Sequence, residues 1–287
     1  MAGTYLHLLL AQQALEGLAE RTDLSEEQAS FYAGVVGPDI GFFPGGPRQL
    51  SDAIHRQHSA DLIRALVAQA QNPAERAFAA GWALHVYTDL AVHPVIDELS
   101  FRLQADHPLA AGADVWHRRI EWGLDCQVLE STALRLWQFP LSFPFEPSAA
   151  SVLERAAKPL YGSLVDTQAI HAGGQAAALW IRRLVPALLW TGGCRRSDCS
   201  LICRLAGAVA NPFARALSSF WEQSEGRDDE VAILGPRRNE DELTHRLRTL
   251  ASESIDAFRD GLRQEYRQLA NRNLSTGELT HPNEDES

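Results

Sequence analysis

Apolar residues recur along most of the chain at intervals of three and four, which gathers them on one face of an α-helix. Long runs of β-branched residues, which favour strands, do not interrupt this spacing. The predicted helices cover residues 4–21, 25–37, 51–70, 73–94, 112–139, 148–172, 174–190, 200–222 and 239–273. The pattern therefore predicts an all-α protein.

Short local signals predict where several of these helices begin and end. Ser25 and Gln28 have the spacing of a capping box, which opens a helix. Pro73 suits the first position of a helix, whereas Pro94 lacks the N–H group that a helix interior needs. We therefore expect the central helix to bend or end at Pro94. The Gly- and Pro-rich stretch 37–47 is predicted to be a loop.

Length and composition favour one large domain. The chain has 287 residues, of which 45% are apolar, and this is enough to bury a sizeable core. We expect a single helical hydrolase domain over residues 1–274, with a metal-site core in 1–130 and a helical extension in 148–273. Residues 275–287 are predicted to be a disordered acidic tail.

Charge and hydropathy limit the partners and the location. The net charge of −11 leaves no basic nucleic-acid footprint, so nucleic acid is not an expected partner. The apolar run at residues 6–11 has no basic residues before it and no cleavage site after it. No uncharged apolar stretch reaches the roughly 18 residues of a membrane span. We expect a cytoplasmic protein without a transmembrane segment; the pattern gives no oligomeric state.

The chain contains four cysteines, and three of them, Cys194, Cys199 and Cys203, lie close together. Their spacings of five and four residues do not match the common zinc patterns. Free cysteine is among the most buried residue types, so we interpret these residues as buried thiols.

The most specific pattern is formed by His85, Asp89 and His93, which lie four residues apart. On a helix this spacing places two imidazoles and a carboxylate in one column. The intervening residues are mostly apolar, so the column is expected to be buried, where ionisable groups need partners or a metal. The spacing alone leaves two alternatives open, a metal site and a structural polar network.

Other metal-ligand residue types in the first half of the chain extend this candidate site. His117 and Glu121 repeat the four-residue spacing, and Asp39 lies among apolar residues, which is unusual for a solvated turn. Six of the ten histidines fall near carboxylates or on apolar helix faces in residues 1–117: His7, His55, His58, His85, His93 and His117. Zinc binds imidazole nitrogen and carboxylate oxygen, and paired metals can clamp a phosphoryl group.

The stretch from Phe78 to Pro94 resembles the metal-binding core of the zinc-dependent phospholipase C family. These are all-helical proteins related in fold to single-strand nucleases of the S1/P1 type. The segment Gly37-Pro-Asp39-Ile is similar to the family's Pro-Asp loop, and Tyr5-Leu-His7-Leu to its N-terminal histidine. The segment from His117 to Asp125 resembles its closing His/Glu helix. The resemblance covers roughly residues 1–130.

The resemblance implies two or three zinc ions, each with its own ligands. One ion is assigned to Asp39, His55, His85 and Asp89. A second ion is assigned to His93, His117 and Glu121. A third ion is assigned to His7, with Asp89 as a bridging ligand. The resemblance also implies that Asp39 orients the attacking water, which makes it the candidate catalytic residue.

Two residues near these ligands are assigned separately. His55 is preferred over His58 because the segment from His55 to Asp61 matches the family's histidine followed, after a short gap, by an aspartate. Asp97 continues the column of the central helix, but a bend at Pro94 is expected to turn it away. We expect Asp97 to cap a helix or to support a ligand.

Together these features predict a zinc-dependent phosphoester hydrolase of the phospholipase C type, acting on a phosphoester and preferably on a phospholipid head-group bond. One alternative is a single-strand-specific nuclease-like phosphodiesterase on the same site. The other is a catalytically degenerate, metal-stabilised interaction protein that uses helices 148–273 as its binding surface.

Overall fold

Helices make up the regular structure of the described residues, which in the computed structural model are 3–18, 24, 26–106, 112–131, 145–183, 239 and 241–280. The α-helices are α1 (Thr4–Glu16), α3 (Gln28–Val36), α4 (Arg48–Arg56), α5 (Ser59–Gln69), α6 (Pro73–Asp106), α7 (Ala113–Ser131), α8 (Pro147–Tyr161), α9 (Thr167–Arg183) and α12 (Asp241–Arg263). Two 3₁₀-helices, η1 (Gly37–Phe42) and η3 (Gly162–Leu164), complete them. Within these ranges β-structure is limited to one isolated bridge, between Arg272 and Leu279. The predicted all-α class is confirmed.

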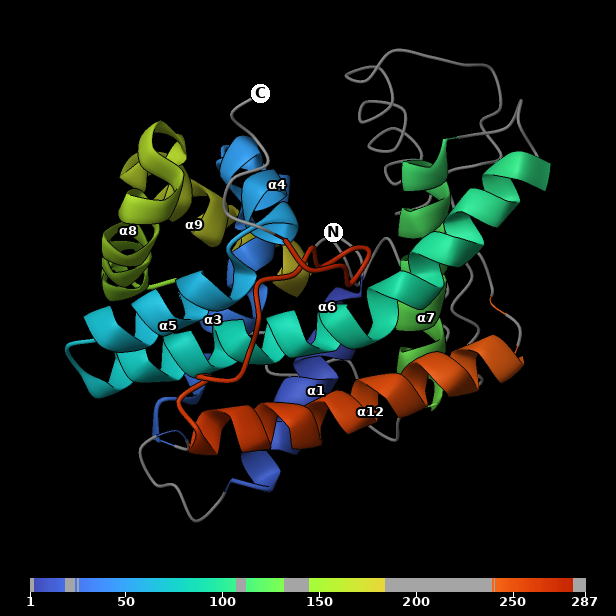
Figure 1. Cartoon of the computed structure of the whole chain (residues 1–287), viewed down its shortest axis with the longest axis horizontal. Coiled ribbons are helices and arrows are strands. Elements are labelled where there is room, and N and C mark those ends of the chain that lie inside the picture. The colour runs from blue at the N-terminus through green and yellow to red at the C-terminus, as the bar shows by residue number, and fades with distance from the viewer. Residues whose placement is uncertain are drawn as a thin grey trace.

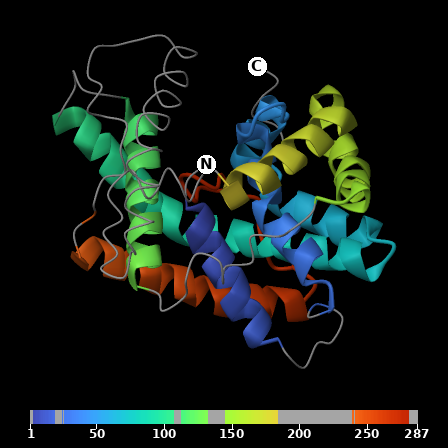
Figure 2. The ribbon, with the colours of Figure 1, turned by 180° about the vertical axis from the view of Figure 1, so that it is seen from behind.

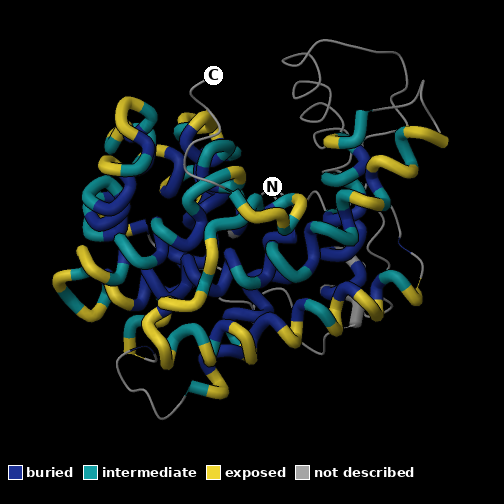
Figure 3. Tube along the Cα trace, in the orientation of Figure 1, coloured by how far each residue is buried: buried dark blue, intermediate teal, exposed yellow. Residues whose placement is uncertain are grey.

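Helix α6 forms the centre of the fold and packs against α3, α5, α7 and α12. Both ribbon views show α12 lying alongside α6, and α7 crossing the C-terminal half of α6 (Figures 1 and 2). Helices α4, α8 and α9 gather at the opposite end of the molecule. In Figure 3 the buried part of the trace follows α6 and its neighbours, while exposed residues lie at the rims. Among the helices of the described ranges, none combines the length and apolar character needed to cross a bilayer.

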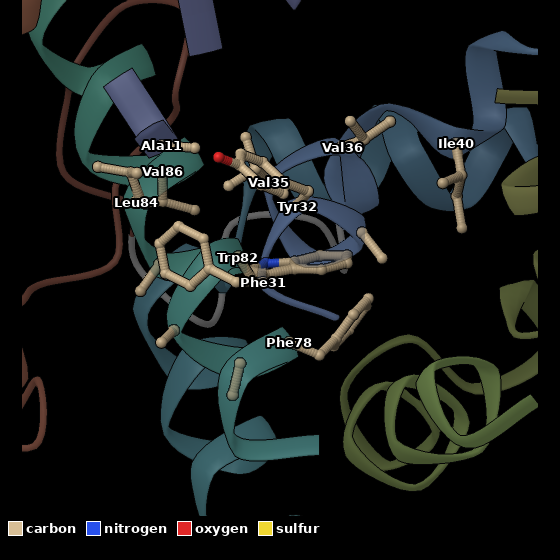
Figure 4. Close-up of a cluster of buried hydrophobic side chains, with 14 of the residues drawn as sticks. Ala11, Phe31, Tyr32, Val35, Val36, Ile40, Phe78, Trp82, Leu84 and Val86 are labelled. Atoms are coloured by element: carbon tan, nitrogen blue, oxygen red, sulfur yellow. The ribbon is translucent and has the colours of Figure 1, made fainter. Parts of the chain in front are cut away.

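The core is densest where α3 crosses α6. Phe31 and Val35 from α3 pack with Phe78 and Trp82 from α6, and all four side chains are fully buried (Figure 4). Burying a side chain of this size contributes about 1.5–3 kcal/mol. This crossing therefore anchors α6, the helix that carries the column of histidines and aspartate.

Two glycines allow α3 and α6 to approach this closely. A Cβ atom at Gly34 would lie 2.0 Å from the carbonyl oxygen of Phe78, and one at Gly81 would lie 2.0 Å from that of Phe31. Any side chain at either position would push the backbones apart. The close crossing also brings the Val35 carbonyl of α3 within reach of α6.

The helix predicted over residues 51–70 is wrong as a single element. It is two helices, α4 and α5, separated at Gln57 and His58. His58 adopts a left-handed backbone with φ of 56°, which ends the helical path. Distant residues hold this break: the Tyr161 hydroxyl donates to the Gln57 carbonyl, and the Leu274 N–H donates to the His55 carbonyl.

The loop predicted over residues 37–47 is also wrong in its first half, which forms η1. Pro38 lies in the first turn of this 3₁₀-helix, where its fixed φ is suited to helical structure and its missing N–H is not needed. The Gly41 N–H donates to the Ser51 hydroxyl, which ties η1 to α4. Asp39 is thereby placed inside the protein rather than in a solvated turn.

Pro94 does not end α6, which continues to Asp106. Figure 1 shows the helix changing direction in its C-terminal part, in keeping with the predicted bend. The missing N–H costs one helical hydrogen bond. Val92 and Ile96, which flank the proline, are both buried and keep α6 on the core. Tertiary packing thus keeps the helix continuous through the proline.

The helix predicted over 148–172 is also wrong as a single element, since α8 ends at Tyr161 and α9 begins at Thr167. Two other helices end earlier than predicted, by 5 and 10 residues. Helix α1 ends at Glu16 rather than at 21, and α12 ends at Arg263 rather than at 273. Residues 275–280 of the predicted disordered tail are ordered: Gly277 donates to the Asn273 carbonyl, and Thr280 to that of Asn271.

Several predictions of the sequence analysis fall outside the described residues. They are the capping residue Ser25, the end of the helix predicted to reach 139, the segments 184–190 and 200–222, the cysteine cluster and the last residues of the tail.

We predict that Gly81→Ala destabilises the protein by about 1–3 kcal/mol, because the new Cβ atom must push α3 away from α6. Urea unfolding of the two proteins measures the difference. In an unhindered helix the same change would stabilise by up to about 1 kcal/mol. A variant at least as stable as the parent would therefore contradict the close crossing.

Candidate metal centre

Five separate elements bring the eight predicted ligand residues into one cluster. Helix α6 supplies His85, Asp89 and His93 from one face, as their spacing predicts. The others come from α1, η1, α4 and α7: His7, Asp39, His55, His117 and Glu121. Three groups form in which the ligand-type atoms all lie within 4.8 Å of one another. Their members are His7, His85 and Asp89; Asp39, His55 and His85; and His93, His117 and Glu121.

The Asp89 carboxylate lies at the centre of the cluster, and its side chain is only 1% exposed. Its Oδ1 atom is 3.1 Å from His7 Nε2 and 3.3 Å from His93 Nε2. Its Oδ2 atom is 2.9 Å from His85 Nε2 and 3.6 Å from His55 Nε2. One carboxylate therefore faces four imidazoles and joins the groups.

The group around His55 and His85 is oriented by backbone carbonyls. His55 Nδ1 lies 2.8 Å from the Ser51 carbonyl, and His85 Nδ1 lies 2.8 Å from the Val35 carbonyl. These bonds place the N–H on Nδ1 and leave both Nε2 atoms free as metal ligands. His55 Nε2 is 3.3 Å from Asp39 Oδ1.

The second group joins α6 to α7. Glu121 Oε1 lies 3.0 Å from His93 Nε2 and 3.2 Å from His117 Nε2. On its other side, the His117 ring hydrogen-bonds through Nδ1 to the carboxylate of Asp97. Asp97 therefore faces the site instead of turning away, because α6 continues through Pro94. It contacts the predicted ligand His117, which agrees with one of the two roles predicted for it.

The third group places α1 against α6. The rings of His7 and His85 stack with centroids 4.3 Å apart and an interplanar angle of 6°. Two protonated imidazoles stacked in this way would repel each other. The pKa of His7 is lowered, first by burial and then by His85, so that His7 can present a neutral nitrogen.

His58 stays outside the cluster. Its Nδ1 atom lies 3.4 Å from the carboxylate of Asp61, within the turn that begins α5. The geometry therefore agrees with the choice of His55 over His58.

The hydrogen bonding of the cluster suits a metal rather than a purely polar network. Asp89 has no hydrogen-bond partner for either carboxylate oxygen, and His85 Nε2 has none, although these atoms approach one another. Buried polar atoms are almost always hydrogen-bonded, and leaving one unpaired costs about 1–3 kcal/mol. Converging atoms without hydrogen-bond geometry are what a coordinating cation would satisfy. The residues therefore fit a group of divalent ions.

The charges of the cluster stabilise one another strongly. Burial alone would lower the pKa of His85, but Asp89 and Asp39 raise it to about 9. Burial likewise opposes the charge on His117, and Glu121 with Asp97 raises the His117 pKa to about 10. Burial would raise the pKa of Asp89, but His85 and His93 hold it well below its usual range.

Asp125 is a further buried carboxyl group at the edge of the cluster. Its Oδ1 accepts a hydrogen bond of 3.0 Å from the N–H of Leu6, in the first turn of α1, and this holds the helix that carries His7. Burial raises the pKa of Asp125 to about 7. Asp125 lies one helical turn after Glu121 and ends the segment that resembles the family's closing helix, but its contact with α1 could not be inferred from the sequence.

The all-α fold thus encloses a buried cluster of imidazoles and carboxylates that could hold metal ions. The chain matches the family model described as zinc-dependent phospholipase C over residues 6–165. The chain thus belongs to the zinc-dependent phospholipase C family. The match extends past the predicted limit of 130 and includes α8. No curated protein and no solved structure was found to match the chain.

We predict that metal-free protein loses stability as the pH rises from about 6.5 toward 9–10. The pKa values of His85 and His117 lie above their ordinary value of 6.5, so their protonated forms stabilise the fold. That contribution is complete below pH 6.5 and is lost as the pH passes the raised values. Thermal unfolding of chelator-treated protein between pH 6 and 10 measures it.

Bound zinc should abolish this loss of stability at high pH. Zinc binds deprotonated imidazoles, so its affinity increases as the pH rises. Zinc-loaded protein serves as the matched sample in the same titration. A metal-free protein more stable at pH 9 than at pH 6.5 would show that the ion pairs of the cluster do not contribute as described.

Proposed function

We propose that the protein is a zinc-dependent phosphoester hydrolase of the phospholipase C type, which uses two or three ions. The observation that carries this proposal is the position of Asp89, whose two carboxylate oxygens face the imidazoles of His7 and His93 on one side and of His55 and His85 on the other. Shared ligands favour ions close enough to act on one phosphoryl group. Membership of the family supports zinc as the metal.

Each group of ligands has a separate part in the proposal. Asp39, His55, His85 and Asp89 would hold one ion, His93, His117 and Glu121 a second, and His7 with Asp89 as a bridging ligand a third. When bound, zinc supplies Lewis-acid polarisation of the phosphoryl oxygens and lowers the pKa of a bound water to near neutrality. Asp97 would keep His117 in the tautomer whose Nε2 faces the ion.

Asp39 is the residue that we propose for orienting the attacking water. Burial opposes its ionisation, but His85 and His55 lower its pKa to about 2, so it is a carboxylate at neutral pH. Its side chain is 12% exposed, against 1% for Asp89, so it lies nearer to solvent. An ionised oxygen in that place can accept a proton or a hydrogen bond from water.

We also propose that the chain to residue 274 acts as one domain. Helix α12 lies beyond the family match, but it packs against both α6 and α1. It therefore shares the core that carries the cluster. A phospholipid head-group bond is the preferred substrate, in keeping with the family.

We predict two or three zinc ions per chain in purified protein, measured by elemental analysis. Asp89→Asn should lose at least one ion, because its amide cannot bridge as a carboxylate does. Asp52→Asn, at a half-buried aspartate on α4 outside the cluster, is the matched control and should retain all of them. Fewer than one zinc per folded wild-type chain would contradict the proposal.

We predict that Asp39→Asn lowers the rate of phosphatidylcholine hydrolysis by about 10²–10⁴-fold, the usual contribution of a general base. Zinc content measured on the same sample should fall by at most one ion. Single-stranded oligonucleotide is the comparison substrate. Faster turnover of the oligonucleotide than of the lipid would favour the nuclease alternative, and turnover of neither would favour an interaction protein.

A further inference from the structure

The segment from Tyr266 to Thr280, which we call the C-terminal strap, lies beyond the family match yet returns to the metal cluster. Figure 1 shows it leaving the end of α12 and crossing α6. Tyr266 and Leu274 are buried, with exposed fractions of 2% and 0%. Arg64 of α5 donates to the carbonyls of Tyr266 and Leu269. The strap is therefore fastened to the helices beneath it.

The strap bonds directly to the break between α4 and α5. The Leu274 N–H donates to the carbonyl of His55 at 2.7 Å. Ser59, the first residue of α5, both donates to the Arg272 carbonyl and accepts from the Arg272 N–H, each at 2.9 Å. Asn271 Oδ1 accepts from the N–H groups of Ala60 and Asp61.

These bonds satisfy the backbone groups that two helix ends leave unpaired. The last carbonyls of α4 and the first N–H groups of α5 have no partner inside their helices. Asn271 acts as an N-cap supplied from outside the helix, a contact usually worth about 1 kcal/mol. The strap therefore fixes where α4 ends and how α5 leaves it.

The position of α4 sets the position of the His55 imidazole. The ring is bonded through Nδ1 to the Ser51 carbonyl of the same helix, so the imidazole and α4 move as one body. The turn of the strap also rests against α6, where a Cβ atom at Gly277 would lie 3.3 Å from Pro94. The strap thus spans two helices that carry ligands.

We infer that the C-terminal strap positions His55 for metal binding through its bonds to the α4–α5 break. Leu274, Ser59 and Asn271 are the residues that act through His55. The inference rests on the proposed zinc centre, specifically on the ion held by Asp39, His55 and His85. It predicts that loosening the strap weakens that ion and spares the one held by His93, His117 and Glu121.

The test measures zinc affinity in full-length variants by competition with a chromophoric chelator. Leu274→Ala removes the buried anchor, and Ser59→Ala removes both bonds to Arg272 with little change in volume. Each substitution should lower the affinity for one zinc ion by about 10–100-fold, the usual effect of losing a group that supports a ligand. The affinity of the ion on α7 should stay within twofold.

Leu247→Ala on α12 is the matched control, because Leu247 is also fully buried and the truncation is identical. It should destabilise the fold to a similar degree and leave every zinc affinity unchanged. Leu274→Met keeps the side-chain volume and should restore binding. If Ser59→Ala and Leu274→Ala bind all their zinc as tightly as wild type, the inference is overturned.

Failure of the proposed function would look different. Wild-type protein that binds zinc but hydrolyses no phosphoester would overturn the hydrolase and leave the strap inference standing, because the readout is affinity alone. If Leu247→Ala and Leu274→Ala lowered the affinity for every zinc ion equally, the strap inference would be overturned, since general loosening of the fold would then explain the loss.

Discussion

The cluster of histidines and carboxylates depends on the side chain of Asp89, a carboxylate that is buried away from water. Transferring an isolated ion to the protein interior is so costly that it persists only with partners of opposite charge or with a metal. Asp89 meets this requirement through four imidazoles that approach its two oxygens. Removing the Asp89 carboxylate would leave the four imidazoles without their negatively charged partner. Removing the imidazoles would leave a buried carboxylate without a positively charged partner. The helices that supply these groups must therefore be held to within a fraction of an ångström.

The close crossing of α3 and α6 provides part of that precision. Gly34 and Gly81 let the two backbones meet, and the meeting sets the Val35 carbonyl against His85. A hydrophobic contact thereby decides which nitrogen of a histidine faces the cluster. Packing and ligand chemistry are coupled here, because the glycines serve the core and the tautomer together.

The sequence predicted what depends on local spacing or on the family motif. His85, Asp89 and His93 share a face because helical geometry alone requires it. The motif identified His7, Asp39, His55, His117 and Glu121, which the structure brings together. The errors have a common cause, which is that distant residues decided the local conformation.

The break at His58 is one such case, since Tyr161 and Leu274 hold it from more than 100 and 200 residues away. The passage of α6 through Pro94 is another, because buried neighbours on each side outweigh the lost hydrogen bond. No local signal in residues 51–70 or 94–106 encodes either outcome. Asp97 stays next to His117 despite the bend of the helix, because α7 packs against this part of α6.

The bond between Ser59 and Arg272 joins residues 213 positions apart. Contacts of such long range form late, because a large loop must close before they contribute. During synthesis, α4 and α5 leave the ribosome well before the segment that secures their junction. On the proposed function, full retention of zinc should thus await the emergence of residues 266–280, so that ion uptake would report on the maturity of each newly made molecule.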